Sequence, residues 1–131
     1  MHPSMYLPRK KVLVIDDSPE LLDVFKAILE RQGYEIIAKS SPRDIHTFVK
    51  NNRIDILFLD VILQSINGKT ICKELKSNAL TSYFPIVLMS TNPAYIKDFR
   101  EHDADACIEK PFDISSLIKK INSLTKKKRL T

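Results

Sequence analysis

Two adjacent aspartates end an apolar run in the stretch VLVIDDSPELL, which spans Val12 to Leu22. Neighbouring carboxylates repel each other and resist burial, so a buried strand that runs into Asp16 and Asp17 requires an explanation. One interpretation is an exposed turn in front of a helix. The other is a site that holds a cation.

Three further apolar runs end in side chains that suit the same chemistry. Asp60 follows ILFL, Ser90 follows IVLM, and Lys110 follows ACIE. Carboxylate oxygens suit Mg²⁺, and an aspartate can act as a nucleophile that carries phosphate. Lysine offers a point charge and serine a hydrogen-bond donor to phosphoryl oxygens. Each residue alone has an ordinary explanation, but together they indicate a phosphoryl-transfer site.

The elements that must position these side chains follow from an alternation of apolar strands with amphipathic helices. Strands are predicted at 11–15, 34–38, 54–60, 85–90 and 105–109. Helices are predicted from Ser18-Pro19 to Gly33, from Ser41-Pro42, after Gly68, around Ala94–Arg100, and from about Ile114 to Leu124. This alternation is typical of a parallel sheet with helices on both faces, where ligands bind at the carboxyl ends of the strands. We therefore expect the reactive residues to meet at one rim.

The length of 131 residues suits one domain, with a core over about residues 10–125, a short N-terminal tail and a basic C-terminal tail. No apolar run approaches the roughly 20 residues of a membrane span, and the N-terminus lacks a signal-peptide core, so we expect a cytoplasmic protein. Cys72 and Cys107 form no metal-type pair, and we expect both to be reduced. Nine basic residues lie in 1–11 and 119–131, so the net charge of +5 belongs mainly to the ends, which we expect to be solvated.

With these motifs in order, the chain resembles a receiver domain of the two-component response regulators, of the single-domain chemotaxis type. The matching pieces cover nearly the whole chain: VLVIDDSPELL, DILFLDVILQSINGKTICKELK, FPIVLMS and DACIEKPFDISSLIKKI. The resemblance implies a flavodoxin-like α/β fold, a three-layer (βα)5 sandwich whose five-stranded parallel sheet has the order 2-1-3-4-5.

The resemblance also implies a role for each site residue. Asp60 matches the phosphate acceptor and, with Asp17 and the backbone carbonyl of Ile62, a ligand of Mg²⁺ or Mn²⁺. Asp16 matches the acid that holds a water of the metal. Ser90 matches the hydroxyl that turns toward the phosphoryl group. Lys110 matches the lysine that pairs with this group, and its bond to the next proline matches a cis peptide.

The implied function is that of a stand-alone receiver. It would take a phosphoryl group from a sensor histidine kinase or a phosphotransfer protein, catalyse this transfer and its own dephosphorylation, and dock to a partner protein. We see no room for a DNA-binding domain and no membrane segment. The kinase, the downstream target and the oligomeric state stay open. Apolar Ile62 and bulky Thr91 predict a long-lived phosphate, whereas Asn92 works the other way.

Three positions depart from the family pattern. Cys107 stands where the family usually has an aromatic residue that moves on activation, and ordinary packing is the favoured interpretation of nearby Tyr95 and Phe99. Thr91 is larger than usual at its position. Gln64 replaces a frequent proline, which predicts a looser loop after the acceptor.

Three other functions were weighed. A phosphohydrolase with an aspartate nucleophile typically has a second aspartate two residues later, where this chain has Ile62 or Ser18. A nucleotide-binding module would need a glycine-rich loop, and the chain has two glycines and no such motif. A receiver-like interaction domain with an atypical or phosphorylation-independent output stays open because of Cys107.

Overall fold

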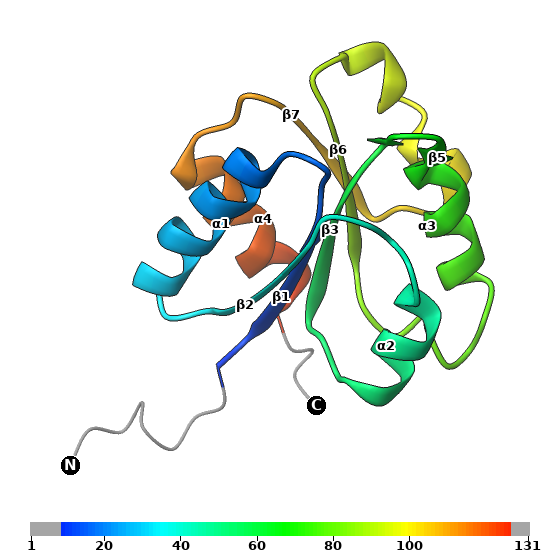
Figure 1. The fold of residues 1–131 in the computed structure, drawn as a ribbon, viewed down its shortest axis with the longest axis horizontal. Helices are drawn as coiled ribbons and strands as arrows, with labels where there is room; N and C mark the ends of the chain where they lie inside the picture. Colours follow the sequence, from blue (N-terminus) through cyan, green and yellow to red (C-terminus); the bar gives the residue numbers. More distant parts are fainter. Residues whose placement is uncertain (1–8, 127–131) are drawn as a thin grey trace.

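A single five-stranded parallel sheet runs through the computed structural model of the chain, which describes residues 9–126. The sheet has the order β2-β1-β3-β6-β7, which confirms the expected strand order (Figure 1). The strands are β1 (Lys11–Ile15), β2 (Glu35–Lys39), β3 (Ile56–Asp60), β6 (Ile86–Ser90) and β7 (Ala106–Glu109). The two tails predicted beyond this core lie almost entirely outside the described residues.

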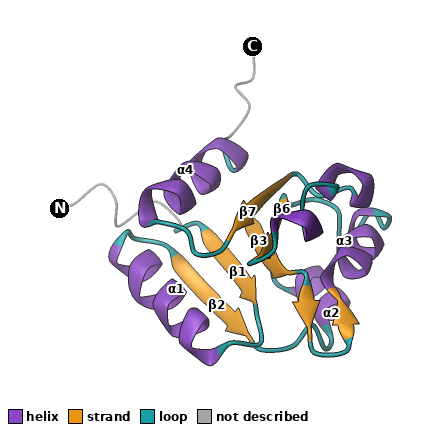
Figure 2. Ribbon diagram, turned by 90° about the horizontal axis from the view of Figure 1, so that it is seen from above, coloured by secondary structure: helices purple, strands orange, loops and turns teal. Residues whose placement is uncertain are grey.

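Helices cover both faces of the sheet, as Figure 2 shows from above. One face carries α1 (Pro19–Arg31) and α4 (Ile114–Leu124), and the other carries α2 (Ile45–Asn51) and α3 (Gly68–Lys76). Strand side chains alternate between the two layers, so Val12 packs with α1 and α4 while Leu13 packs with α2 and α3. No helix within residues 9–126 is long and apolar enough to cross a bilayer.

Two predicted helix starts have different outcomes. The helix predicted from Ser18-Pro19 is confirmed, because the Ser18 side chain accepts the Leu21 N–H as an N-cap. The helix predicted from Ser41-Pro42 begins only at Ile45. There the Ser41 hydroxyl accepts the Arg43 N–H inside a local turn, so the serine stabilises the turn and not the helix.

The helix predicted around Ala94–Arg100 is replaced by two short 3₁₀ turns, Pro93–Tyr95 and Phe99–His102. The described residues thus hold four α-helices and not the five of a (βα)5 pattern. Ile96 is buried and Phe99 packs against the same core layer three residues later. A three-residue spacing matches the 3₁₀ period, so two turns are enough to place both side chains on the core.

Three lysines of α3 form ion pairs with the segment that connects β6 to β7. They follow one another at helical spacing, and each pairs with an aspartate between β6 and β7. We call this set the lysine–aspartate ladder. Its pairs are Lys69–Asp98 at 2.8 Å, Lys73–Asp103 at 3.5 Å and Lys76–Asp105 at 2.8 Å.

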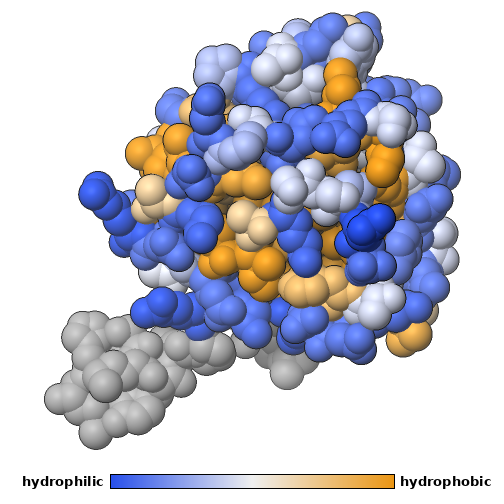
Figure 3. Space-filling model, viewed as in Figure 1, coloured by the Kyte–Doolittle hydropathy of each residue, from blue (hydrophilic) through white to orange (hydrophobic). Residues whose placement is uncertain are grey.

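The surface is mostly hydrophilic on the face drawn in Figure 3, with apolar side chains gathered in its middle. This is where the edge strand β2 crosses in Figure 1. Ile36 and Ile37 of β2 are only half-buried, each against a different core layer. The edge strand is therefore less covered than the four other strands.

Candidate functional site

Three carboxylates meet where β1 and β3 end. One oxygen from each of Asp16, Asp17 and Asp60 lies within 4.8 Å of the other two. Asp16 is 1% exposed and Asp60 6% exposed, whereas Asp17 is not buried. The parallel strands bring Asp60 to two adjacent aspartates that lie 43 and 44 positions earlier in the sequence.

Lys110, which follows β7, supplies the positive charge of the cluster. Its Nζ lies 2.5 Å from Oδ2 of Asp16 and 3.5 Å from Oδ1 of Asp60, and the side chain is 14% exposed. Its backbone N–H donates to the carbonyl of Ser90 at 2.8 Å. The Lys110–Pro111 peptide bond is cis, as the family resemblance implied.

The electrostatics leave Asp60 under-compensated. Burial raises its pKa, and the charge of Asp16 raises it further, while Lys110 and the Ile62 N–H act in the opposite direction. Asp16 is better satisfied, since its Oδ2 faces Lys110 and its Oδ1 accepts the Ser18 N–H at 2.9 Å. The cluster therefore carries more negative charge than one lysine offsets, which favours a bound cation.

Ser90 ends β6, the strand next to β3, and is 3% exposed. Its Oγ accepts the Asn92 N–H at 3.0 Å, and this bond does not use the hydroxyl proton. Ile62 lies two residues after Asp60 and donates its N–H to Oδ1 of Asp60 at 3.4 Å. Its side chain is 52% exposed, so the position borders the site without filling it.

The segment after Asp60 is a small hairpin that the sequence did not predict. Antiparallel strands β4 (Ile62–Leu63) and β5 (Ile66–Asn67) are joined by a two-residue turn. Gln64 has φ +52 in this turn, a region that non-glycine residues enter mainly at tight turns. The loop expected at Gln64 is thus the two-residue turn of a hairpin, and its looseness stays a prediction.

Gly68 packs against the backbone at the end of β3, a close approach that the sequence pattern did not predict. Its N–H donates to the Val61 carbonyl at 2.7 Å. A Cβ at this position would collide with the carbonyl oxygen of Asp60 and lie 3.1 Å from Cα of Val61. One of only two glycines in the chain, eight residues after a strand-end aspartate, is a signal that could have indicated this approach.

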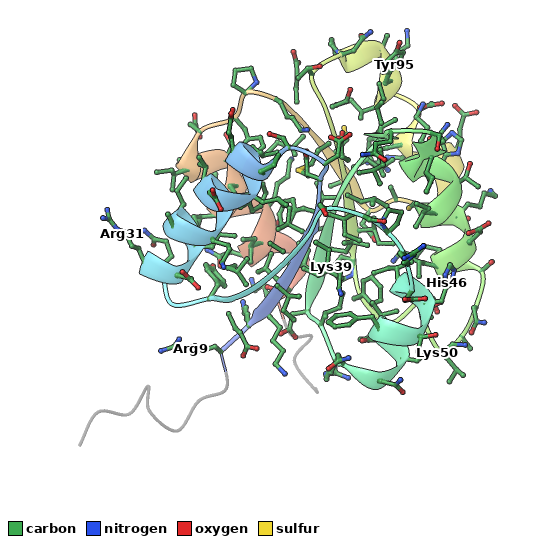
Figure 4. The ribbon with its side chains drawn as sticks, in the orientation of Figure 1. Arg9, Arg31, Lys39, His46, Lys50 and Tyr95 are labelled. Carbon is green, nitrogen blue, oxygen red and sulfur yellow. The ribbon has the colours of Figure 1, made fainter. Side chains whose placement is uncertain are left out.

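The two aromatic residues near the site differ in their surroundings. Phe99 packs on the core beside half-buried Cys107, which is the ordinary packing favoured from the sequence. Tyr95 is 43% exposed and lies at the top of the molecule in Figure 4. Together with Ile62 and Ile66 it lines a pocket of about 360 Å³. Both cysteines are free thiols as expected, and burial raises the pKa of Cys72 to about 12.

Residues 12–122 match the family model of the response regulator receiver domain. Response regulator SaeR of Staphylococcus aureus (strain USA300) is 29% identical over 121 residues, which cover 86% of this chain and 49% of SaeR. The chain therefore spans about half the length of the curated relatives it matches.

Solved structures share the fold. Chemotaxis protein CheY4 of Vibrio cholerae is 23% identical with a TM-score of 0.80, over 89% of this chain and 99% of CheY4. A putative response regulator of Chloroflexus aurantiacus J-10-fl is 24% identical with a TM-score of 0.84, over 92% and 100% of the two chains. The receiver domain of sensor histidine kinase PA1611 of Pseudomonas aeruginosa PAO1, which has a magnesium ion in its active-site cleft, is 19% identical with a TM-score of 0.81, over 92% and 100%.

Proposed function

We propose that this chain, which belongs to the response regulator receiver domain family, accepts a phosphoryl group on Asp60 and passes the signal on by docking to a partner protein. The donor would be a sensor histidine kinase or a phosphotransfer protein. The observation that carries this proposal is the setting of Asp60: a buried carboxylate beside two other acids and 3.5 Å from a lysine ammonium.

The acid cluster fits Mg²⁺ or Mn²⁺. Its donors are hard oxygens, one from each of three side chains, that lie within 4.8 Å of one another. Burial first and the charge of Asp16 second raise the pKa of Asp60, and a cation beside this carboxylate would offset both effects. Asp16, Asp17, Asp60 and the backbone carbonyl of Ile62 would hold the ion. Once bound, the ion would supply positive charge for the carboxylates and the phosphoryl oxygens. A magnesium ion in the cleft of the PA1611 receiver supports the same assignment here.

Asp60, Lys110 and Ser90 would each have a separate role in the transfer of the phosphoryl group. A carboxylate oxygen of Asp60 attacks phosphorus, the phosphorus–nitrogen bond of the donor phosphohistidine breaks, and the histidine leaves with the bonding pair. Lys110 stands 3.5 Å from Asp60 and is placed to attract a phosphoryl oxygen. The Ser90 hydroxyl has a proton to donate to another oxygen. Positioning and charge account for most catalysis of this kind.

A phosphorylation-independent interaction domain is the second candidate. Cys107 favours it, because a half-buried thiol cannot gate space as an aromatic ring does. Under this alternative the hairpin of β4 and β5 and the pocket that Tyr95 lines would bind a partner whether or not Asp60 carries a phosphoryl group.

Intact-mass measurement after incubation with acetyl phosphate and Mg²⁺ tests the acceptor. The wild type should gain one phosphoryl group, Asp60→Asn none, and Asp23→Asn, an exposed carboxylate on α1, should behave as the wild type. Phosphorylation of Asp60→Asn at the wild-type rate would reject Asp60 as the acceptor. A wild type that is never modified would favour the interaction-domain alternative.

The metal is tested by thermal unfolding with and without Mg²⁺. Mg²⁺ should raise the midpoint of the wild type, because a ligand that binds only the folded state stabilises it. Asp17→Ala removes a ligand from the exposed side of the cluster, so its midpoint should hardly respond. An equal rise in both proteins would show that Asp17 does not bind the ion.

A further inference from the structure

A second concave site lies at the opposite end of the sheet from the acid cluster. It is a groove of about 1360 Å³ bordered by the segments that enter β1, β3 and β6 and by the last turns of α4. Arg9 belongs to this groove and Tyr95 borders the phosphorylation site, and Figure 4 shows the two at opposite ends of the molecule. We call it the basal groove. Its residues include the first and the last that the structure describes.

The basal groove concentrates positive charge. Six basic side chains line it against one acid, while the other described residues hold 12 basic and 15 acidic side chains. The acid, Asp55, already accepts the Lys11 N–H at 2.7 Å. None of the six basic side chains forms an ion pair within the described residues, in contrast to the lysines of the ladder. They are Arg9, Lys10, Lys11, Arg53, Lys119 and Lys126.

The remaining lining decides what kind of anion fits. The ring of Tyr83 has the Arg53 guanidinium 5.5 Å from its centroid and the edge-on ring of Phe84 at 4.9 Å. Its hydroxyl accepts the Ile54 N–H and donates to the Val49 carbonyl. This is the one aromatic ring in the lining, and a single ring that is 39% exposed is a poor platform for the stacking of successive bases by which single-stranded nucleic acids bind.

Shape argues against a membrane. The six basic side chains surround a hollow, so they cannot all meet a flat layer of headgroups. An extended chain with closely spaced carboxylates can enter the hollow. Asn122, Ser123 and Thr125 at its rim add hydrogen-bonding groups of the kind that polypeptide backbones pair with.

We propose that the basal groove binds an acidic polypeptide segment of a partner protein. Its distance from Asp60 lets such a partner stay bound while a phosphodonor occupies the opposite rim. Since the binding would rest on charge, it should weaken steeply with salt.

Fluorescence anisotropy with a labelled polyglutamate peptide at low ionic strength tests this. Arg53→Glu/Lys119→Glu reverses two exposed groove charges and should weaken binding about tenfold. Lys26→Glu/Arg31→Glu makes the same change in net charge on the exposed side of α1 and should weaken it by about twofold at most. All proteins keep the full chain, so the basic residues beyond 126 are the same in every sample.

Three results would overturn the proposal: no binding by the wild type, equal losses in both double variants, or a preference for oligothymidylate or phosphatidylserine vesicles over polyglutamate. If circular dichroism shows that the first variant is unfolded, Lys119→Glu/Lys126→Glu replaces it, because both side chains are exposed. Phosphorylation by acetyl phosphate should be unchanged in every variant. A failure of groove binding is thereby separate from a failure at Asp60.

Discussion

Gly68→Ala should disturb the proposed phosphorylation site because the added methyl group has no room there. Gly68 has an ordinary negative φ, so alanine suits its backbone conformation. The new Cβ, however, would overlap the carbonyl oxygen of Asp60 and lie 3.0 Å from the carbonyl carbon. These atoms belong to a buried central strand, and no side-chain rotation can relieve the contact.

The size of the effect follows from two opposing contributions. Overpacking a tight site costs about 1–3 kcal/mol, and a clash with backbone belongs at the upper end. Alanine recovers about 0.5–1 kcal/mol of helix preference over glycine. The free energy of unfolding should therefore fall by about 2 kcal/mol, which lowers the thermal midpoint by roughly 8 °C in a domain of this size. Because the Asp60 backbone must shift, phosphorylation should slow as well.

Gly33→Ala is the matched control, since the chain has only these two glycines. At Gly33 a Cβ would meet nothing within 4 Å, but φ is +92. Its cost of about 1–2 kcal/mol comes from the backbone conformation alone. This residue follows Gln32, the C-cap of α1, and its substitution should leave the phosphorylation rate unchanged.

Urea unfolding and the rate of modification by acetyl phosphate, measured on both variants, separate these effects. The expected pattern is a stability loss in both proteins and a slower phosphorylation in Gly68→Ala only. A Gly68→Ala protein within about 0.5 kcal/mol of the wild type, with an unchanged rate, would refute the close approach to Asp60.

Three further predictions concern individual side chains. Burial and the charge of Asp16 raise the pKa of Asp60 above its ordinary value of 3.8. The folded protein therefore binds this proton more tightly than the unfolded chain, and without divalent ions the free energy of unfolding should fall as the pH rises from 3.8 through the raised pKa. Urea midpoints measured across this range should change less with pH in Asp60→Asn than in the wild type. Lys76→Met removes the ion pair with Asp105 and the 2.8 Å hydrogen bond to the Phe84 carbonyl, so the free energy of unfolding should fall by about 1.5–3 kcal/mol. Lys73→Met removes an exposed ion pair and should lower it by under about 0.5 kcal/mol in the same urea assay. Ile62→Asn should shorten the phosphoprotein lifetime several-fold, about 1 kcal/mol, because an amide can orient a water where an apolar side chain cannot; equal or slower decay after donor removal would contradict it.

The sheet could be predicted because continuous apolar runs flanked by helical patterns have few alternatives. Strand order came from the family resemblance, and the rim followed from the position of the polar residues at the strand ends. Local signals failed where a second local structure used the same residues. Ser41-Pro42 resembles a helix start, but its hydroxyl closes a turn. In the segment predicted as the fourth helix, two 3₁₀ turns are enough, because Ile96 and Phe99 lie three residues apart and both reach the same core layer.

Other features depend on tertiary contacts that no local pattern encodes. The close approach of Gly68 to the backbone of Asp60 and Val61 is a contact between the start of α3 and the end of β3, and the sequence pattern gives no sign of it beyond the glycine itself. The lysine–aspartate ladder joins residues 29 or 30 positions apart, and the sequence shows only scattered charges there. The chemical roles of the site residues are untested by geometry and stay predictions.

Asp16 and Asp17, which follow β1, make different contacts, and this difference indicates different roles. Asp16 turns inward, where Lys110 and the Ser18 N–H satisfy both of its oxygens. Its burial is therefore tolerated without a metal, because the close ammonium and the hydrogen bond offset the high cost of taking this carboxylate out of water. Asp17, the less buried neighbour, has a carboxylate oxygen within 4.8 Å of one from Asp16 and one from Asp60. The ion would thus compensate mainly the charge of Asp60, the buried acid whose only cation in the described residues is shared with Asp16.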